Sequence, residues 1–280
     1  MIIVGVDGSS TARTAVEWAA DDAVRMRLPL RLVHAVDRLP YEISRYPGPI
    51  QHDTLLSTAA RILREAADVA RERQPGVDVT TVMVEGAPVM VLRDQAEEAT
   101  EVVLGSRGLG GFAGALLGSV SARVAGQVHC PVVVVRPEYA ARRGDVVVGV
   151  DDSTECDAAL VYAFEQAKLR GATLRAVHAW LLPIHDYAPE IGYGMDEIRQ
   201  AQQRVVGEKV ATFGGAYPGV KVVEDVYAAR TVDALTEASD TATLLVVGSH
   251  GRGAFGSVLL GSVSRGVLHH ARCAVAVVRA

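Results

Sequence analysis

The sequence predicts an α/β fold with two doubly wound domains, each built on a five-stranded parallel sheet. The run Val4–Asp7 returns 144 positions later as Val148–Asp151, a period too long for a solenoid. Each half alternates short apolar runs with helical patterns, which is typical of a parallel sheet covered by helices on both faces. A glycine-rich stretch follows the fourth apolar run of each half, at Gly105–Ser121 and Gly248–Ser264. These three observations indicate two copies of one domain.

In the first half, the expected strands are the apolar runs 2–6, 30–36, 77–84, 101–104 and 131–136. Ser9 or Ser10 can cap the first helix, because a serine oxygen accepts a hydrogen bond from the first turn. Prolines mark 37–52 as a loop before a second helix over 53–73. A third helix is expected within 86–99, and a fourth follows the glycine stretch.

The second half repeats this order. Its expected strands are 145–150, 173–179, 220–227, 243–247 and 274–279. The segment Glu138–Gly144 is the expected linker, so the domains are predicted to span 1–138 and 145–280. The loop after the second strand recurs at 180–195.

The duplicated glycine stretch is suited to binding an anion. It lies between a strand and a helix, and a helix start has N–H groups without partners and the positive end of the dipole. Glycines let the backbone approach a ligand closely. Ser119 or Ser262 could cap the helix or donate a hydroxyl to a phosphate. A flexible surface loop is the plain alternative, but two copies with the same internal spacing favour a phosphate site.

The predicted topology places a second group beside each glycine stretch. In doubly wound sheets, ligands bind beyond the carboxyl ends of the strands, where the winding reverses. If strands one and four are neighbours there, Asp7 or Asp151 faces the glycine stretch. Each aspartate can instead be an ordinary turn residue after a strand.

With these residues in view, the chain resembles the universal stress protein family in its tandem two-domain form. The motif is Gly-x-x-Gly, nine residues, then Gly-Ser, combined with Val-Gly-Val-Asp at the start and His-Ala after the second strand. The resemblance covers nearly the whole chain, once per half. It implies a Rossmann-like fold of the universal stress protein type and one ATP in each half, and it brings Mg²⁺ into consideration.

The resemblance also implies roles for individual residues. Asp7 and Asp151 are expected on the ribose and metal side. Contacts to adenine are expected from Gly5, Val6, Ala35, Gly149, Val150 and Ala179. The ribose and phosphates are expected beside Gly105, Arg107, Gly108, Gly248, His250 and Gly251. The phosphates are expected at Gly118, Ser119, Val120, Ser121, Gly261, Ser262, Val263 and Ser264.

Composition and charge argue against several classes of function. The chain has 280 residues, 49% of them hydrophobic, and a net charge of −5, which argues against a general nucleic-acid role. No apolar run approaches the roughly 18 residues of a membrane span, and the start reads as a strand and not as a signal peptide. We therefore expect a cytoplasmic protein that binds neither membrane nor nucleic acid. Family members often pair, so a homodimer is expected, and the regulatory partner is unknown.

The sequence argues against an efficient enzyme. Lys168, Lys209 and Lys221 are its only lysines and none is close in sequence to a glycine stretch. Phosphoryl transfer normally requires cationic groups on the moving phosphoryl. The favoured function is an ATP-binding regulatory stress protein with slow or no hydrolysis. The alternatives are a nucleotide-handling enzyme, through ATP hydrolysis or adenylyl transfer, and an interaction module without nucleotide.

For the remaining candidate residues, a structural role is the simpler interpretation. His34 and His178 are expected to make structural hydrogen bonds at strand ends, with proton transfer as the alternative. Cys130 and Cys273 are expected as small buried residues. Loop tyrosines could cover the base, contact a partner or be ordinary loop residues; these are Tyr41, Tyr46, Tyr187 and Tyr193.

Overall fold

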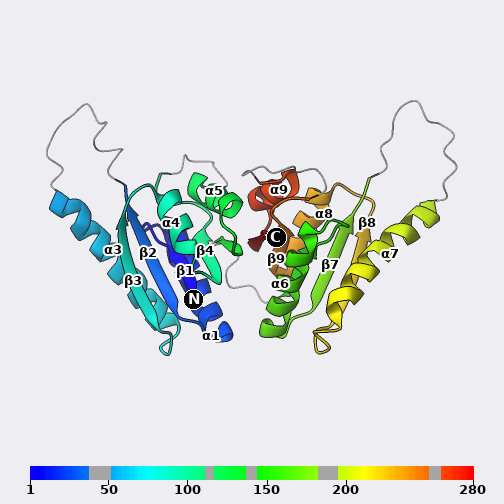
Figure 1. The fold of residues 1–280 in the computed structure, drawn as a ribbon, viewed down its shortest axis with the longest axis horizontal. Helices are drawn as coiled ribbons and strands as arrows, with labels where there is room; N and C mark the ends of the chain where they lie inside the picture. Colours follow the sequence, from blue (N-terminus) through cyan, green and yellow to red (C-terminus); the bar gives the residue numbers. More distant parts are fainter. Residues whose placement is uncertain (38–51, 111–116, 137–143, 182–194, 252–259) are drawn as a thin grey trace, which may run out of the picture. The chain divides into compact units, whose positions relative to one another are not determined.

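The computed structural model describes residues 1–37, 52–110, 117–136, 144–181, 195–251 and 260–280 (Figure 1). The chain forms two compact units, Met1–Ala140 and, in the second half, Ala141–Ser257 with Gly261–Ala280. Of the expected linker, only Gly144 is described. The four loop tyrosines lie outside the described residues: Tyr41, Tyr46, Tyr187 and Tyr193.

The first unit has the predicted alternation of strands and helices. Its strands are β1 (Ile2–Gly5), β2 (Leu30–Val36), β3 (Val79–Glu85), β4 (Glu101–Gly105) and β5 (Val132–Val135). Its helices are α1 (Ser10–Met26), α3 (His52–Arg73), α4 (Pro88–Ala96) and α5 (Ser119–Gln127). The strands are parallel in the order β3-β2-β1-β4-β5, so β1 and β4 are neighbours where the winding reverses. The doubly wound fold is confirmed.

The second unit repeats this architecture. Its strands are β6 (Asp145–Gly149), β7 (Leu174–Ala179), β8 (Val222–Tyr227), β9 (Ala242–Gly248) and β10 (Ala274–Val278). Its helices are α6 (Glu155–Arg170), α7 (Met195–Gly214), α8 (Thr231–Ala238), the short 3₁₀ helix η2 (Ser239–Thr241) and α9 (Ser262–His270). The strands are parallel in the order β8-β7-β6-β9-β10.

The cores lie between the central strands and the helices. Every residue of β4, β5 and β10 is buried, because helices cover both faces of these strands. The helices pair within each unit, α1 with α3 and α4 with α5, and likewise α6 with α7 and α8 with α9. Each fully buried valine or leucine contributes about 2 kcal/mol of hydrophobic stabilisation.

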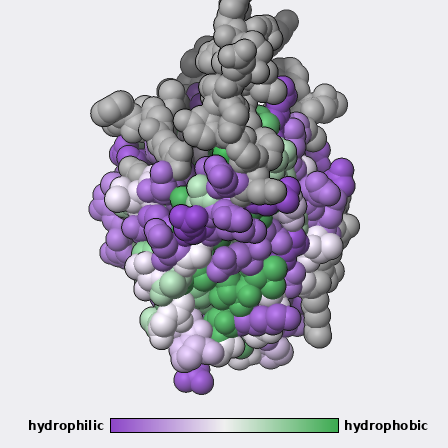
Figure 2. Space-filling model, turned by 90° about the vertical axis from the view of Figure 1, so that its right-hand side faces the viewer, coloured by the Kyte–Doolittle hydropathy of each residue, from purple (hydrophilic) through white to green (hydrophobic). Residues whose placement is uncertain are grey.

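The outer strands β3 and β8 are less buried than the central ones. Figure 2 views the molecule from the side of the second unit's outer elements, where polar side chains surround one apolar patch. In the part of the chain that the structure describes, no helix combines the length and apolar character that crossing a bilayer requires.

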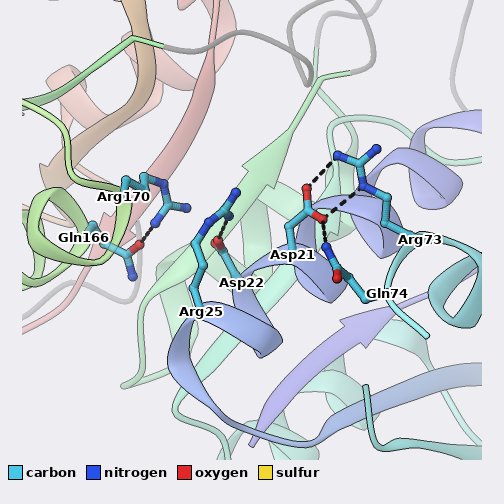
Figure 3. A network of polar contacts seen from close by, with 7 residues as sticks. All are labelled: Asp21, Asp22, Arg25, Arg73, Gln74, Gln166 and Arg170. Carbon is cyan, nitrogen blue, oxygen red and sulfur yellow. Dashed lines mark hydrogen bonds and ion pairs between the residues drawn. The ribbon is translucent and has the colours of Figure 1, made fainter. Parts of the chain in front are cut away.

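A polar cluster ties α1 to the end of α3 (Figure 3). Arg73 donates to the two carboxylate oxygens of Asp21 at 2.7 and 3.0 Å, and Gln74 donates to one of them at 2.7 Å. Burial alone would raise the pKa of Asp21, but the hydrogen bonds from Arg73 and Gln74 and the charge of Arg73 together lower it. The cluster therefore fixes the two helices that cover one face of the first sheet.

The next position on α1 corresponds to a polar position on α6. Asp22 and Gln166 are each 1% exposed, and each accepts a hydrogen bond from an arginine of its own helix, Arg25 and Arg170 (Figure 3). A buried polar group without such a partner would cost free energy, so each helix satisfies this position locally.

Candidate functional site

A pocket of about 280 Å³ lies at the carboxyl ends of β1 and β4 in the first unit. The loop after β1 forms one wall, and the glycine stretch between β4 and α5 forms another. Every site residue predicted for the first half lines it: Gly5, Val6, Asp7, Ala35, Gly105, Arg107, Gly108, Gly118, Ser119, Val120 and Ser121. Residues far apart in the sequence therefore face one cavity.

The second unit has the corresponding pocket, with a volume of about 610 Å³, at the carboxyl ends of β6 and β9. It too is lined by every site residue predicted for its half: Gly149, Val150, Asp151, Ala179, Gly248, His250, Gly251, Gly261, Ser262, Val263 and Ser264. The two pockets thus use equivalent elements of two repeated units.

The aspartate after the first strand shapes the pocket rim. Asp7 Oδ1 accepts a hydrogen bond from the backbone N–H of Ser9 at 2.9 Å, and Oδ2 accepts one from the N–H of Leu109 at 3.0 Å. In the second unit, Asp151 accepts from both the backbone N–H and the hydroxyl of Ser153. Each carboxylate therefore holds the turn that follows its strand, and Asp7 also fixes the glycine stretch opposite.

The glycines of the motif permit close approach to these carboxylates. A Cβ added to Gly108 would lie 2.5 Å from Asp7 Oδ2, and one added to Gly251 would lie 2.9 Å from Asp151 Oδ2. Any larger residue would force the carboxylate or the backbone to move. The requirement for glycine here is spatial, because neither position has a positive φ.

The helix that ends the glycine stretch begins with glycine in both units. Gly118 and Gly261 are the N-caps of α5 and α9, in extended conformation and without a side-chain cap. Their own N–H groups donate to the carbonyls of Ser106 at 2.7 Å and Ser249 at 2.9 Å. Ser119 and Ser262 are therefore the first helical residues, so the capping role considered for them is wrong.

The first turn of each helix presents backbone donors. In α5 the first intrahelical bond runs from the N–H of Ala122 to the Gly118 carbonyl at 3.1 Å, so the three preceding N–H groups have no partner within the helix. In α9 the corresponding bond runs from Arg265 to Gly261 at 3.0 Å. These N–H groups lie at the positive end of the helix dipole, where an anion is stabilised.

Two of the predicted serine hydroxyls have internal partners. The Ser121 hydroxyl donates to the Gly105 carbonyl at 2.7 Å. The hydroxyl oxygen of Ser264 lies 2.9 Å from the Ser249 carbonyl oxygen and 3.1 Å from the Gly261 carbonyl oxygen. These buried hydroxyls hold the helix start against the end of the preceding strand, so at these positions it is the main chain that remains for a ligand.

The histidines at the strand ends make the structural bonds predicted for them. His34 Nδ1 lies 2.7 Å from the Val6 carbonyl, and His178 Nδ1 lies 2.7 Å from the Val150 carbonyl. Because a carbonyl can only accept, both Nδ1 atoms carry a proton. His178 Nε2 also contacts the side chain of Gln202 at 2.8 Å. The ring joins the strand to the loop that carries the aspartate.

The side chains after β4 and β9 differ. Arg107 is exposed, and its carbonyl accepts a hydrogen bond from the Thr11 hydroxyl. His250 is half-buried, and its Nδ1 lies 3.1 Å from the Ser249 hydroxyl. An arginine pairs with phosphate oxygens at any ordinary pH, whereas a histidine does so only when protonated.

Several residues of the pocket walls were not predicted as site residues from the sequence. The second pocket is also lined by Cys156, His178, Trp180, Leu181, Ile198, Gln202, Thr231, Leu235 and Val247, and the first also by Ala12, Val33, His34, Pro88, Leu92, Leu104, Leu109 and Gly110. Trp180 directly follows Ala179, and that adjacency was a usable signal. Gln202 belongs to α7, and nothing in its local sequence indicates that it faces the pocket.

One lysine lies closer to the second site than its sequence position suggests. Lys209 of α7 donates to the carbonyl of Ser153 at 2.8 Å and pairs with Asp157. Its ammonium therefore supports the turn that carries Asp151. Lys168, Lys209 and Lys221 line neither pocket.

The cysteines are free thiols. Cys273 is buried as predicted, whereas Cys130 is half-buried. Burial raises the pKa of Cys130 and of Cys156 to about 11, so both are neutral thiols near neutral pH. Cys156 is therefore an inert part of the second pocket's wall.

The described residues contain no group of three or more histidines, cysteines, aspartates or glutamates that could hold a metal ion. Each pocket has one predicted metal ligand, Asp7, which accepts hydrogen bonds with both carboxylate oxygens, or Asp151, which accepts them with Oδ1. A single carboxylate fits Mg²⁺ that is also coordinated by phosphates and water, and does not fit a metal held by protein alone.

Comparisons with known proteins agree with this architecture. The family profile described as the universal stress protein family matches residues 1–136 and 143–279. A universal stress protein from Archaeoglobus fulgidus of known structure has a TM-score of 0.71 at 21% identity, covering 99% of this chain and 98% of that one. At this identity the likeness concerns the fold.

Two relatives from Mycobacterium tuberculosis are similar over nearly their whole length. Universal stress protein Rv1996 is 36% identical over 301 residues, covering 99% of this chain and 94% of its own. Universal stress protein Rv2005c is 36% identical over 290 residues, covering 99% of this chain and 96% of its own. With both units matched by the family profile and a shared motif at both pockets, the chain belongs to the universal stress protein family.

Proposed function

We propose that each unit binds one ATP and that nucleotide occupancy regulates the protein, with slow or no hydrolysis. The observation that carries this proposal is the duplicated helix start: uncapped first-turn N–H groups at Ser119–Ser121 and Ser262–Ser264, each on the wall of a pocket at the switch point of a parallel sheet. Such a site favours a phosphate group.

In this proposal the triphosphate lies at the glycine stretch and the base lies toward β2 or β7. The phosphates take the backbone donors at the starts of α5 and α9. Asp7 and Asp151 face the ribose or a Mg²⁺ carried by the phosphates. The adenine lies beside Ala35 or Ala179, which line the far side of each pocket.

The pocket volumes support a nucleotide-sized ligand. Small-molecule sites commonly measure about 300–1,000 Å³, so the second pocket, at about 610 Å³, lies within this range and the first, at about 280 Å³, lies just below it. A regulatory role is favoured over catalysis because Lys168, Lys209 and Lys221 line neither pocket. A cytoplasmic location and a homodimer of whole chains belong to the same proposal.

Isothermal calorimetry with ATP and Mg²⁺ tests the sites, with two bound per chain expected. Gly118→Val and Gly261→Val should each weaken one site about a hundredfold, because a side chain there enters the space of the phosphate. An added Cβ would lie 3.4 Å from the Ser106 carbonyl oxygen in the first unit and 3.3 Å from the Ser249 carbonyl oxygen in the second, which is tight, so circular dichroism must show that each variant is folded. Gly105 would be a poor choice, since its Cβ would lie 2.7 Å from the Thr11 backbone.

The matched controls are Gly76→Val and Gly215→Val, where an added Cβ meets nothing within 4 Å. They should keep both sites. ATP turnover, measured in parallel, should stay below about one per minute, far under the usual range of enzymes. Two sites of unchanged affinity in the Gly118→Val/Gly261→Val double variant would overturn the proposal, as would turnover of about one per second.

A further inference from the structure

The two pockets differ on the side away from the glycine stretch. Trp180 and Val36 occupy equivalent positions, each directly after the aligned alanines of β7 and β2. Trp180 lines the second pocket, whereas Val36 is buried and does not line the first. Among the residues that the structure describes, an aromatic ring of tryptophan therefore lines the second pocket, and none lines the first.

A second difference comes from the helix that follows. Ile62 of α3 and Val205 of α7 line equivalent grooves beside α1 and α6. Three residues earlier on each helix are Ala59 and Gln202. Ala59 is 1% exposed and lies outside the first pocket, whereas Gln202 lines the second. The second pocket thus gains a polar side chain where the first unit has a buried methyl group.

The backbone of Trp180 is fixed by a hydrogen bond, whereas its indole N–H has no acceptor among the described residues. Its backbone N–H donates to the Tyr227 carbonyl at 2.9 Å, which fixes the residue to the edge of the sheet. Its indole Nε1 is buried and has no acceptor among the described residues. Buried indole N–H groups normally have a partner. The indole is therefore a large apolar surface with an unused donor in the wall of a ligand-sized pocket.

Gln202 is held by one end. Its side chain contacts His178 Nε2 at 2.8 Å, and the other ring nitrogen donates to the Val150 carbonyl. The atom of Gln202 that faces Nε2 is the amide oxygen, so the amide NH₂ group remains as a donor for a ligand. Glutamine amides are well suited to the edge of an adenine.

We propose that the second unit recognises a purine base, with Trp180 stacking on the ring and Gln202 bonding to its edge, and that it is therefore the tighter ATP site of the chain. This inference rests on the proposed function and adds the residues that determine base specificity. The first pocket, with Val36 and Ala59 at the equivalent positions, binds the phosphates and the base without this recognition.

Fluorescence gives the first test, because the chain has two tryptophans. Trp18 lies in α1, 8% exposed, and lines neither pocket. In a Trp18→Phe variant, emission comes from Trp180 and should change saturably as ATP is added. In a Trp180→Phe variant, emission comes from Trp18 and should stay constant. Circular dichroism confirms that both variants are folded. A response from Trp18 but none from Trp180 overturns the assignment.

Calorimetry in the Gly118→Val background isolates the second site. Trp180→Val and Gln202→Ala, which install the residues of the first unit, should weaken ATP binding there, the former by about tenfold as is typical for loss of base stacking. Tripolyphosphate, which has no base, should bind all three proteins equally. Equal weakening of tripolyphosphate would mean a structural role, and unchanged ATP affinity would mean no contact with the base; either overturns the inference alone. No binding of ATP by the wild-type chain overturns the proposed function as well.

Discussion

The two pockets agree in their main chain and differ in their side chains. Gly118 and Gly261 start their helices with nearly the same geometry, φ −76° and ψ 149° against φ −62° and ψ 166°, and both N–H groups return to a serine carbonyl. By contrast, Trp180 and Gln202 have Val36 and Ala59 as their counterparts. Backbone donors depend little on which side chains surround them, so duplication can preserve one end of a site while the other end changes.

The comparison also concerns packing beneath the pockets. Gly5 and Gly149 end β1 and β6, and the space around them differs. A Cβ on Gly5 would lie 2.7 Å from Leu104 Cδ2 and 3.1 Å from Leu92, whereas one on Gly149 would lie 3.1 Å from Leu235 at closest. Packing is therefore tighter around Gly5, beneath the first pocket, than around Gly149, beneath the second.

The largest expected effect tests this difference in packing. Gly5→Ala should lower the free energy of unfolding by about 2–3 kcal/mol, and Gly149→Ala by about 1 kcal/mol, because overpacking scales with the displacement it forces. Urea denaturation followed by circular dichroism measures both. Equal losses of unfolding free energy in the two variants would show that Leu104 moves aside freely and that packing beneath the two pockets is equivalent.

An intermediate effect is expected at the pocket rim. Asp7→Asn should remove the bond from the Leu109 N–H while keeping an acceptor for Ser9, at a cost of about 1–1.5 kcal/mol. Hydrogen exchange at the Leu109 amide should then accelerate about tenfold. Asp151→Asn is the matched change in the other unit and should leave Leu109 unaffected. If exchange at Leu109 stays constant in Asp7→Asn, the carboxylate does not fix the glycine stretch.

The smallest expected effect concerns pH and the tie between α1 and α3. The pKa of Asp21 lies below its ordinary value of 3.8 in the folded protein, so its pairing stabilises the fold fully above that value and is lost as the pH falls through the folded pKa. Asp21→Asn should cost about 1 kcal/mol or less at pH 7, because Arg73 is half exposed and water screens the pair.

Thermal melts of wild type and Asp21→Asn at pH 7, 4 and 3 measure this effect. The difference in melting temperature should shrink toward the lowest pH. The exposed Asp94, which pairs with its neighbour Arg93, supplies the control variant Asp94→Asn, for which little change is expected at any pH. A difference between wild type and Asp21→Asn that grows on acidification would contradict the assignment.

The fold was largely predictable because its signals are local. The run 30–36 coincides with β2, and other strands shift by one or two residues at their ends. The repeat supplied the same information twice, which removed most ambiguity between short strands and buried helices. The alternation of strand and helix then left few topologies, since crossovers between parallel strands are right-handed.

The candidate site was predictable where it depends on glycines and on residues next to strand ends. Asp7, Gly108 and Gly118 fall at fixed offsets along the chain, so a motif can represent them. Gln202 reaches the pocket from α7, and Lys209 reaches the Ser153 carbonyl from the same helix. Such positions depend on how a helix packs on the sheet, and a local pattern does not encode that rotation.

Capping shows a different limit. Serine is a better N-cap than glycine in isolated helices, so Ser119 was a reasonable candidate. The structure uses Gly118 because its N–H must return to the Ser106 carbonyl at 2.7 Å, with the Ser106 oxygen and the Arg107 Cα both 3.4 Å from where a Cβ would lie. Tertiary closeness outweighed the local preference.

That same hydrogen bond has a practical use. It fastens the chain between Ser106 and Gly118 at its base, and Gly261 with Ser249 does the same in the other unit. A segment clamped at its ends tolerates added length at an entropic cost that rises only with the logarithm of its size. Residues could therefore be inserted between Ser106 and Gly118, or between Ser249 and Gly261, at small cost and without displacing the helix start that follows.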